Sequence, residues 1–175
     1  KTVITASTQK FALLFIDLDG FKKINDSIGH KAGDQILKQT AQRLNKCSFN
    51  NQLICRWGGD EFLVALENTD EATAYKSAEL LIEMLSEPHS IDASVLSVSA
   101  TIGIALFPIH ANSEERLIQL ADMAMYYQKK YAPSTVGVFS EQIEQLHAQE
   151  LRLKNGLFKA IEKQQLRVVF QPLIL

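Results

Sequence analysis

The sequence predicts an α+β fold in which helices pack on an antiparallel sheet. Short apolar runs of strand length alternate with longer segments whose apolar residues recur every three or four positions. Glycine, proline and short polar residues separate these segments, as they do at turns. With 175 residues, of which 46% are hydrophobic and 22% charged, the chain is long enough to bury a sizeable core.

Three strands and one long helix are predicted in the first half of the chain. Residues 11–16 form a continuous apolar run, which is typical of a buried strand. Residues 34–46 have the apolar spacing of one helical face. Residues 53–55 and 62–66 are interpreted as hairpin arms that turn at Gly58-Gly59, because glycine readily adopts the positive φ of a sharp turn.

Two helices and two strands are predicted between residues 70 and 139. Residues 70–87 have helical periodicity, and Pro88 ends that helix. Residues 96–106 alternate between apolar and small polar side chains, which is the pattern of a strand. Residues 113–130 form a further helix with a capping serine, and residues 136–139 form a closing strand.

We interpret these elements as containing the order β-α-β-β-α-β, which is the ferredoxin-like arrangement with helices on one face of the sheet. The domain comprises residues 1–139, and its core module spans about 11–139. Residues 140–155 are expected to form a linker helix. Residues 156–175 are expected to be the truncated start of a further domain, because a strand-like run at 166–170 has no partner after it.

Composition narrows the class of ligand and the compartment. A net charge of −2 gives no general attraction to nucleic acid or to anionic membranes, so any phosphate must be bound locally. Cys47 and Cys55 match no metal-ligand spacing and are expected to be reduced. There is no signal peptide and no apolar stretch of membrane-spanning length, so we expect a cytoplasmic domain, compatible with a membrane anchor elsewhere in a longer protein.

Acidic residues follow two of the predicted strands. Asp17 follows the first strand, and Asp60 and Glu61 lie at the hairpin turn. If the two strands are neighbours, Asp17 and Asp60 can converge on Mg²⁺, which takes one or two carboxylates together with water and phosphate oxygens. The alternative is that Asp17 and Asp19 cap the next helix and that the hairpin acids are solvated turn residues.

Three segments resemble one family. Residues 58–62 read Gly-Gly-Asp-Glu-Phe, the signature of the GGDEF family of diguanylate cyclases, and residues 17–34 and 121–129 resemble its metal- and guanine-binding segment and its last helix. Residues 151–172 are similar to the opening of an EAL phosphodiesterase domain. The resemblance implies a nucleotide-cyclase or palm-like fold within a GGDEF-EAL tandem protein of bacterial second-messenger signalling.

The resemblance also implies a reaction and its partners. Two GTP molecules, each held by one domain of a homodimer, would condense to cyclic di-GMP with release of pyrophosphate, using Mg²⁺ or Mn²⁺. The implied partners are GTP, a second copy of the domain, the adjoining EAL domain and an upstream sensor domain. No contact with nucleic acid and no direct contact of this segment with the membrane are implied.

The metal and catalytic residues follow from the same motifs. By resemblance, Asp17, Asp60 and the backbone of Leu18 bind the metal, and Glu61 and Asp60 are catalytic. Successive strand residues face opposite ways, so Asp60 and Glu61 cannot both point at one ion in a regular strand. We therefore favour Asp60 as the metal ligand.

The nucleotide-binding residues are implied in the same way. Asn25 and Asp34 would bind guanine, because a carboxylate can accept from its N1 and N2 donors and an amide can satisfy further edge positions. Lys22 and Lys129 would contact phosphate. Without the resemblance, the favoured interpretation of Asn25 and Asp34 is that they cap helices around a turn at residues 29–33, and the alternative for Lys129 is a solvated lysine at a helix end.

The chain departs from the family pattern at two places. Pro133 stands where the family has an arginine, so one phosphate donor is lost. This loss favours a rival function, a degenerate GTP-binding module that regulates an adjoining EAL phosphodiesterase. A ferredoxin-like RNA- or protein-binding module is disfavoured, because the chain lacks net positive charge and an exposed aromatic pair on a strand.

The second departure generates a prediction. Phe49 and Gln52 replace the arginine and aspartate of the family's inhibitory product site, so both charges that would hold the product are missing. We expect cyclic di-GMP to cause no feedback inhibition through this site. GTP turnover measured with increasing cyclic di-GMP should stay constant; a slowing caused by product bound near Gln52 would contradict the prediction.

Overall fold

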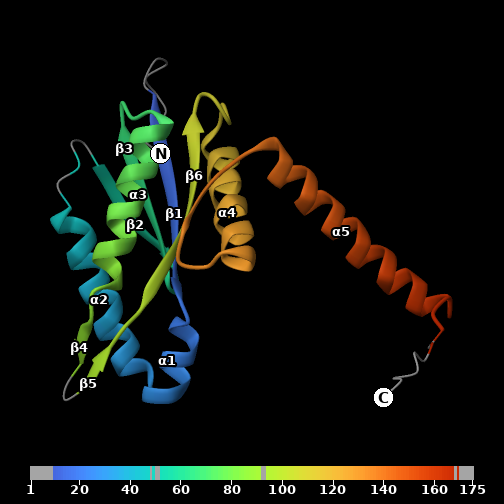
Figure 1. Ribbon diagram of the computed structural model, residues 1–175, viewed down its shortest axis with the longest axis horizontal. Coiled ribbons are helices and arrows are strands. Elements are labelled where there is room, and N and C mark those ends of the chain that lie inside the picture. The colour runs from blue at the N-terminus through green and yellow to red at the C-terminus, as the bar shows by residue number, and fades with distance from the viewer. Residues whose placement is uncertain (1–9, 48, 50–51, 92–93, 168, 170–175) are drawn as a thin grey trace, which may run out of the picture. The chain divides into compact units, whose positions relative to one another are not determined.

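A computed structural model describes residues 10–47, 49, 52–91, 94–167 and 169. The chain divides into two compact units, Lys1–Ser140 and Glu141–Leu175. The first unit contains a five-stranded sheet, a small two-stranded sheet and four helices in its described part (Figure 1). Its elements in chain order are β1 (Phe11–Asp19), α1 (Phe21–Ile28), α2 (His30–Lys46), β2 (Gln52–Gly58), β3 (Glu61–Glu67), α3 (Glu71–Ser86), β4 (His89–Ile91), β5 (Ser94–Leu96), β6 (Ser99–Phe107), α4 (Glu114–Tyr131) and β7 (Val136–Val138).

The main sheet has the strand order β2-β3-β1-β6-β7. Its first four strands are antiparallel and form the ferredoxin-like core, which confirms the predicted fold class. The prediction of a wholly antiparallel sheet is wrong at one edge, because β7 runs parallel to β6, with Val136 opposite Ile102. The chain returns from β6 through α4, and such a helical crossover places the next strand parallel.

Helices cover both faces of the sheet, so the expectation that they share one face is wrong. The side chains of β1 alternate between two clusters: Leu14 and Ile16 pack with α2 and α3, whereas Leu13 and Phe15 pack with α4. Residues 11–18 are all buried, which is the pattern of a strand covered on both sides. The apolar run at residues 11–16 is continuous because helices cover both faces of this strand.

The segment after β1 contains a helix that the sequence analysis missed. α1 has only eight residues, and although Phe21, Ile24 and Ile28 lie at helical spacing, only Phe21 is buried, so the apolar pattern is too short to indicate a helix. α2 begins at His30 and not at residue 34. Gly29 alone separates the two helices, with φ of 97°, a conformation that favours glycine.

The strand predicted at residues 96–106 is two strands. β5 pairs with β4 in the separate small sheet, and β6 starts at Ser99 in the main sheet. Both faces of β6 are buried, because α3 covers one face of this strand and α4 covers the other. The buried residues therefore include Thr101, Gly103 and Ala105, which alternate along the strand with the larger apolar residues. Cys47 and Cys55 are free thiols, as expected.

The second unit contains α5 (Glu141–Glu162), a single helix that extends beyond the linker helix expected at residues 140–155. None of the residues of α5 is buried. The proposed boundary at residue 155 lies within this helix, and the assignment of residues 156–175 to a further domain stays a prediction. The strand expected at 166–170 includes residues 168 and 170, which lie outside the described residues. Over the described ranges, the structure contains no helix with the length and apolar character needed to cross a membrane.

The close approach of α4 to β6 gives a testable prediction. A Cβ atom at Gly103 would lie 2.1 Å from the Ala121 carbonyl oxygen and 2.2 Å from the Met125 nitrogen, both backbone atoms. We expect Gly103→Ala to lower the free energy of unfolding by about 3 kcal/mol, the upper end for overpacking. Gly137→Ala is the matched control, because its nearest contact is 3.1 Å from the Ala124 oxygen. Equal losses for the two variants in urea unfolding would contradict this account.

Candidate functional site

The two acidic segments meet at one end of the sheet. β1 and β3 are neighbours, as the metal hypothesis required, and Asp17 lies directly opposite Glu61 in their ladder. The Leu18 N–H donates to the Asp60 carbonyl oxygen over 3.3 Å. The N–H and C=O of one strand residue point to the same side, so the Leu18 carbonyl also faces the hairpin.

The hairpin turn places Asp60 and Glu61 differently. Gly59 and Asp60 form the turn between β2 and β3, with Gly59 at φ of 51°, and Arg56 donates two hydrogen bonds to the Gly59 carbonyl oxygen at 3.0 and 2.7 Å. Asp60 therefore lies outside the strands. Side chains of directly opposed residues share a face of the sheet, so Glu61 faces the same side as Asp17. The alternation argument that favoured Asp60 over Glu61 does not apply to this geometry.

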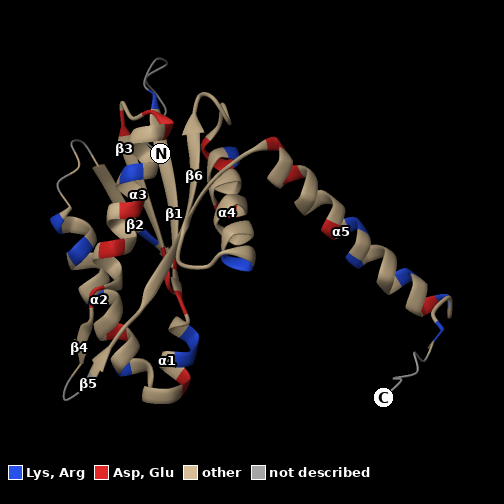
Figure 2. Cartoon of the chain, in the orientation of Figure 1, with Lys and Arg blue, Asp and Glu red and all other residues tan. Residues whose placement is uncertain are grey.

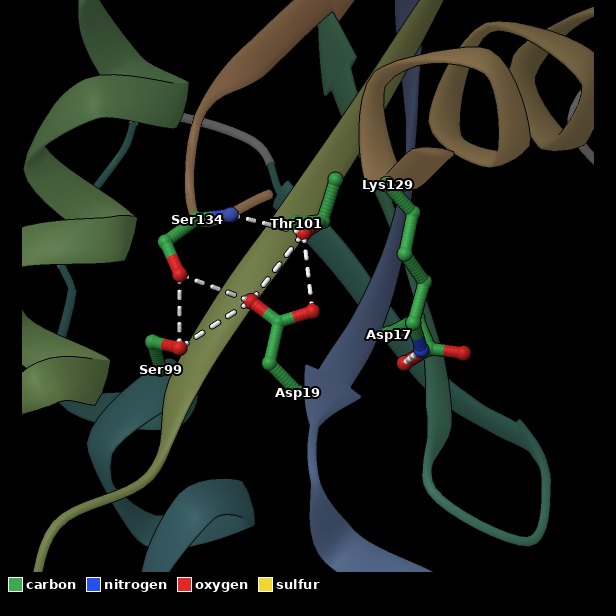
Figure 3. A network of polar contacts seen from close by, with 6 residues as sticks. All are labelled: Asp17, Asp19, Ser99, Thr101, Lys129 and Ser134. Carbon is green, nitrogen blue, oxygen red and sulfur yellow. Dashed lines mark hydrogen bonds and ion pairs between the residues drawn. The ribbon is translucent and has the colours of Figure 1, made fainter. Parts of the chain in front are cut away.

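One lysine faces this acidic group. The Lys129 ammonium, in the last turn of α4, donates to the Asp17 carboxylate and forms an ion pair with it. Figure 3 shows the lysine extending from the end of α4 to Asp17. Acidic residues gather where β1 ends, and basic residues lie at the end of α4 (Figure 2).

The carboxylates are held at an electrostatic cost. Burial raises the pKa of Asp17, the Lys129 contact lowers it, and the charges of Asp60 and Asp19 raise it again. Burial also raises the pKa of Glu61, with further increases from repulsion by Asp17, Asp122 and Asp60. A single ammonium thus faces several acidic groups, and an added cation would relieve their repulsion.

This arrangement fits Mg²⁺ better than a closed metal cage. In the described part of the chain, no three His, Cys, Asp or Glu side chains form a group that could hold a metal by themselves. Mg²⁺ needs only one or two carboxylates, because it keeps several waters and binds substrate phosphates. Asp17, a hairpin carboxylate and the Leu18 carbonyl meet that need. The metal ligands Asp17, Leu18 and Asp60 and the preference for Mg²⁺ or Mn²⁺ stay predictions.

Asp19 has a different role from the helix cap considered for it. It lies in β1 and accepts hydrogen bonds from Ser99, Thr101 and Ser134. The N-cap of α1 is Gly20, which makes no side-chain capping bond. The helix-cap alternative for Asp17 and Asp19 is therefore wrong.

The two guanine candidates lie on adjacent helices. Asn25 is on α1 and the exposed Asp34 is in the second turn of α2. Neither caps a helix, because α1 and α2 begin after Gly20 and Gly29 without side-chain caps, so this alternative is also wrong. The Asn25 Oδ1 atom is buried and has no hydrogen-bond partner within the described residues. A ligand N–H would satisfy it.

Gly33 makes room for Asn25. A Cβ atom at Gly33 would lie 2.0 Å from the Asn25 Oδ1 atom, so only glycine allows the amide to lie against α2 at this point. The sequence analysis interpreted Gly33 as part of a turn, whereas the structure places it inside α2. Its role is to admit a neighbouring side chain, which no sequence pattern revealed.

The remaining candidates are Lys22, Phe49 and Gln52. Lys22 is exposed in the first turn of α1, and no hydrogen bond or ion pair of this lysine is found among the described residues. Phe49 packs against the main core cluster, and Gln52 donates to the Cys47 carbonyl oxygen. Residues 50 and 51 lie outside the described residues. The absence of the inhibitory product site stays a prediction.

Sequence reasoning missed one acidic contributor to the site. Asp122 on α4 raises the pKa of Glu61, so it lies close to the hairpin acids. It falls within residues 121–129, the segment that resembles the family's last helix, and that resemblance was the only signal for it. The packing of α4 beside the end of β1 could not be predicted from local sequence patterns.

The ferredoxin-like sheet thus ends in two facing carboxylates, Asp17 and Glu61, with Lys129 ion-paired to Asp17. Comparison with known proteins specifies the class. Residues 2–133 match the family model for the diguanylate cyclase GGDEF domain. The chain therefore belongs to the GGDEF family.

Similar proteins support this assignment. The chain is 36% identical over 167 residues to the bifunctional diguanylate cyclase/cyclic di-GMP phosphodiesterase MucR of Pseudomonas aeruginosa, a match to 95% of this chain and 24% of that protein. It is 36% identical over 169 residues to the cyclic di-GMP phosphodiesterase PdeR of Escherichia coli, covering 97% and 26%. The solved GGDEF domain of TpbB (YfiN) from P. aeruginosa has a TM-score of 0.76 and 39% identity, covering 80% of this chain and 83% of that one.

The chain thus spans about a quarter of the length of these two curated relatives. They are named as a bifunctional enzyme and as a phosphodiesterase, whereas TpbB, 44% identical over 126 residues, is named as a diguanylate cyclase. Membership of the family therefore does not decide which activity this chain has.

The raised pKa of Glu61 gives a pH-dependent prediction. Folding raises this pKa above its ordinary value near 4.5, so the stabilising effect of the protonated form is present at low pH and is lost as the pH rises through the folded pKa. We expect Glu61→Gln to raise the melting temperature at pH 7.5, and to raise it less at pH 4. Glu67→Gln, at the other end of β3, is the control. A lower melting temperature for Glu61→Gln at pH 7.5 would overturn this account.

The Gly33–Asn25 contact gives a second prediction. The methyl group of Gly33→Ala would displace the Asn25 amide, while the helix itself tolerates alanine well. We expect GTP affinity to fall roughly tenfold, the value of about one hydrogen bond, with little change in melting temperature. Calorimetry with GTP measures the effect, and Gly156→Ala on α5 is the control, because the added methyl group meets no atom within 4 Å there. Unchanged GTP affinity would remove Asn25 from the guanine site.

Proposed function

We propose that this chain is a Mg²⁺-dependent diguanylate cyclase domain that condenses two GTP into cyclic di-GMP. The observation that carries the proposal is the register of β1 and β3, which places Asp17 opposite Glu61 within reach of Lys129. This arrangement combines a cation site with a phosphate-binding ammonium. The family match and the named activity of TpbB support the same reaction.

The nucleotide is held at its two ends. Asn25 and Asp34 accept from the guanine edge, and the buried unpaired oxygen of Asn25 supports this role. Lys129 and Lys22 contact the phosphates. Binding at both ends fixes the α-phosphate relative to the hairpin, and such positioning accounts for a large part of any phosphoryl-transfer catalysis.

The acidic residues serve the chemical step. Asp17, the Leu18 carbonyl and Asp60 hold the metal, which when bound neutralises charge that develops on the phosphate oxygens. Glu61 lies on the same face as Asp17, and its raised pKa suits a group that accepts a proton from the attacking hydroxyl. The 3′-hydroxyl oxygen of one nucleotide attacks the α-phosphorus of the other, and pyrophosphate leaves.

The reaction needs two copies of the domain. Each copy binds one GTP and presents it to the other, so we propose an active homodimer with two such half-sites. We further propose that the domain works in the cytoplasm beside an EAL domain and under an upstream sensor domain. The EAL partner is supported by relatives named as cyclic di-GMP phosphodiesterases.

A second candidate function is a GTP-binding regulatory module for an adjoining EAL phosphodiesterase. Pro133 favours it, because this exposed residue supplies no side-chain donor where the family has an arginine. Such a charged hydrogen bond is worth about 1.5 to 3 kcal/mol, so its loss would weaken GTP binding roughly tenfold to a hundredfold. Binding of GTP without turnover would distinguish this candidate.

One assay tests the proposal. The purified protein is incubated with GTP and Mg²⁺, and products are resolved by mass; we expect cyclic di-GMP and pyrophosphate. Asp60→Ala and Glu61→Ala should each reduce formation at least about a hundredfold while the fold is retained. Glu67→Ala, in the same strand but away from the site, should retain activity. GTP binding without any product would instead support the regulatory module.

A further inference from the structure

Asp19 and Asp17 both hold the end of α4. They are two residues apart on β1, so their side chains point to the same face of the sheet. Asp17 pairs with Lys129 in the last turn of α4, and Asp19 binds Ser134 in the segment that follows it. Figure 3 shows both carboxylates beside the end of this helix.

The Asp19 carboxylate is the centre of a small hydroxyl network. It accepts from the Thr101 hydroxyl at 2.9 Å and from the Ser99 and Ser134 hydroxyls at 3.0 Å each. The Ser134 N–H donates to the Thr101 hydroxyl oxygen at 3.0 Å. The network therefore joins β1, β6 and the segment after α4 (Figure 3).

This network holds the connection between α4 and β7 in a strained shape. Residues 132–135 are all that separates the two elements. Ser134 has φ of 63°, a left-handed conformation that residues other than glycine rarely adopt. A strained residue persists where its surroundings hold it, and here the hydrogen bonds to Asp19 and Thr101 do so. The end of α4 is thereby fixed relative to β1.

We propose that Asp19 is a positioning residue that acts through Ser134 to set Lys129 for contact with the triphosphate. The inference rests on the proposed GTP-binding function and deepens it. Pro133 supplies no donor, so the end of α4 contacts phosphate through Lys129. The position of the Lys129 ammonium therefore matters more for phosphate binding here than it does in family members in which an arginine also contacts the phosphate. A displacement of about 1 Å in a positioned group is enough to impair a phosphoryl-transfer site.

The test removes one arm of the network. Ser134→Ala removes the hydroxyl that joins the α4 connection to Asp19 and Ser99, and leaves the Ser134 N–H bond to Thr101 in place. Ser90→Ala is the matched control, because it removes the hydroxyl of an exposed serine in β4, outside this network. Calorimetry with Mg²⁺ and 3′-deoxy-GTP, which lacks the attacking hydroxyl, measures binding without turnover. GMP, which lacks the outer phosphates, is the second ligand.

We expect Ser134→Ala to weaken 3′-deoxy-GTP binding roughly threefold to tenfold, with GMP binding unchanged and Ser90→Ala close to wild type. In a Lys129→Ala background, Ser134→Ala should cause no further loss, because the two residues act in series. Wild-type affinity in Ser134→Ala, an equal loss for GMP, or a full additional loss in the Lys129→Ala background would each overturn the inference.

A measurement without nucleotide separates this inference from the proposed function. Amide hydrogen exchange at residues 128–131 should be faster in Ser134→Ala than in Ser90→Ala, because the last turn of α4 loses part of its anchor. Equal exchange in the two variants would refute the positioning role. If the wild-type protein binds neither GTP nor 3′-deoxy-GTP, the proposed function fails, while the exchange experiment still decides whether Asp19 anchors α4 through Ser134.

Discussion

The site depends on the register between β1 and β3. This register puts Asp17 opposite Glu61 and lets the Leu18 N–H bond the hairpin at Asp60. A shift of one residue would turn every side chain of β1 to the other face, and both clusters of apolar residues that pack on β1 would be disrupted. The core therefore enforces the alignment of the acidic residues, although none of the acidic residues contributes to the core.

The electrostatics of the site are unfavourable without a ligand. Asp17 and Glu61 both have raised pKa values because they are partly buried and lie near other acids. Lys129 offsets part of this cost, and a bound cation would offset more. Groups kept in such a state are typical of functional sites, where stability is reduced in favour of chemistry. Asp19 differs, because its hydroxyl partners satisfy it within the fold.

Much of the fold was predictable because strand and helix patterns are local. The apolar run of β1 and the glycine pair of the hairpin placed their strands correctly. α1 was missed because it has only eight residues, fewer than the stretch over which helical periodicity can be recognised. The direction of β7 and the second helical layer were also misjudged, since both depend on which face of the sheet α4 covers.

By itself, the sequence determined most of the secondary-structure elements, the two acidic strand ends and membership of the family, because each is encoded in neighbouring residues. Only the tertiary structure decided which side chains meet. The pairing of Lys129 with Asp17, the fit of Asn25 against Gly33 and the bond from Ser134 to Asp19 join residues from different elements. Such contacts follow from packing and register, which depend on the whole sheet and are not local properties of the chain.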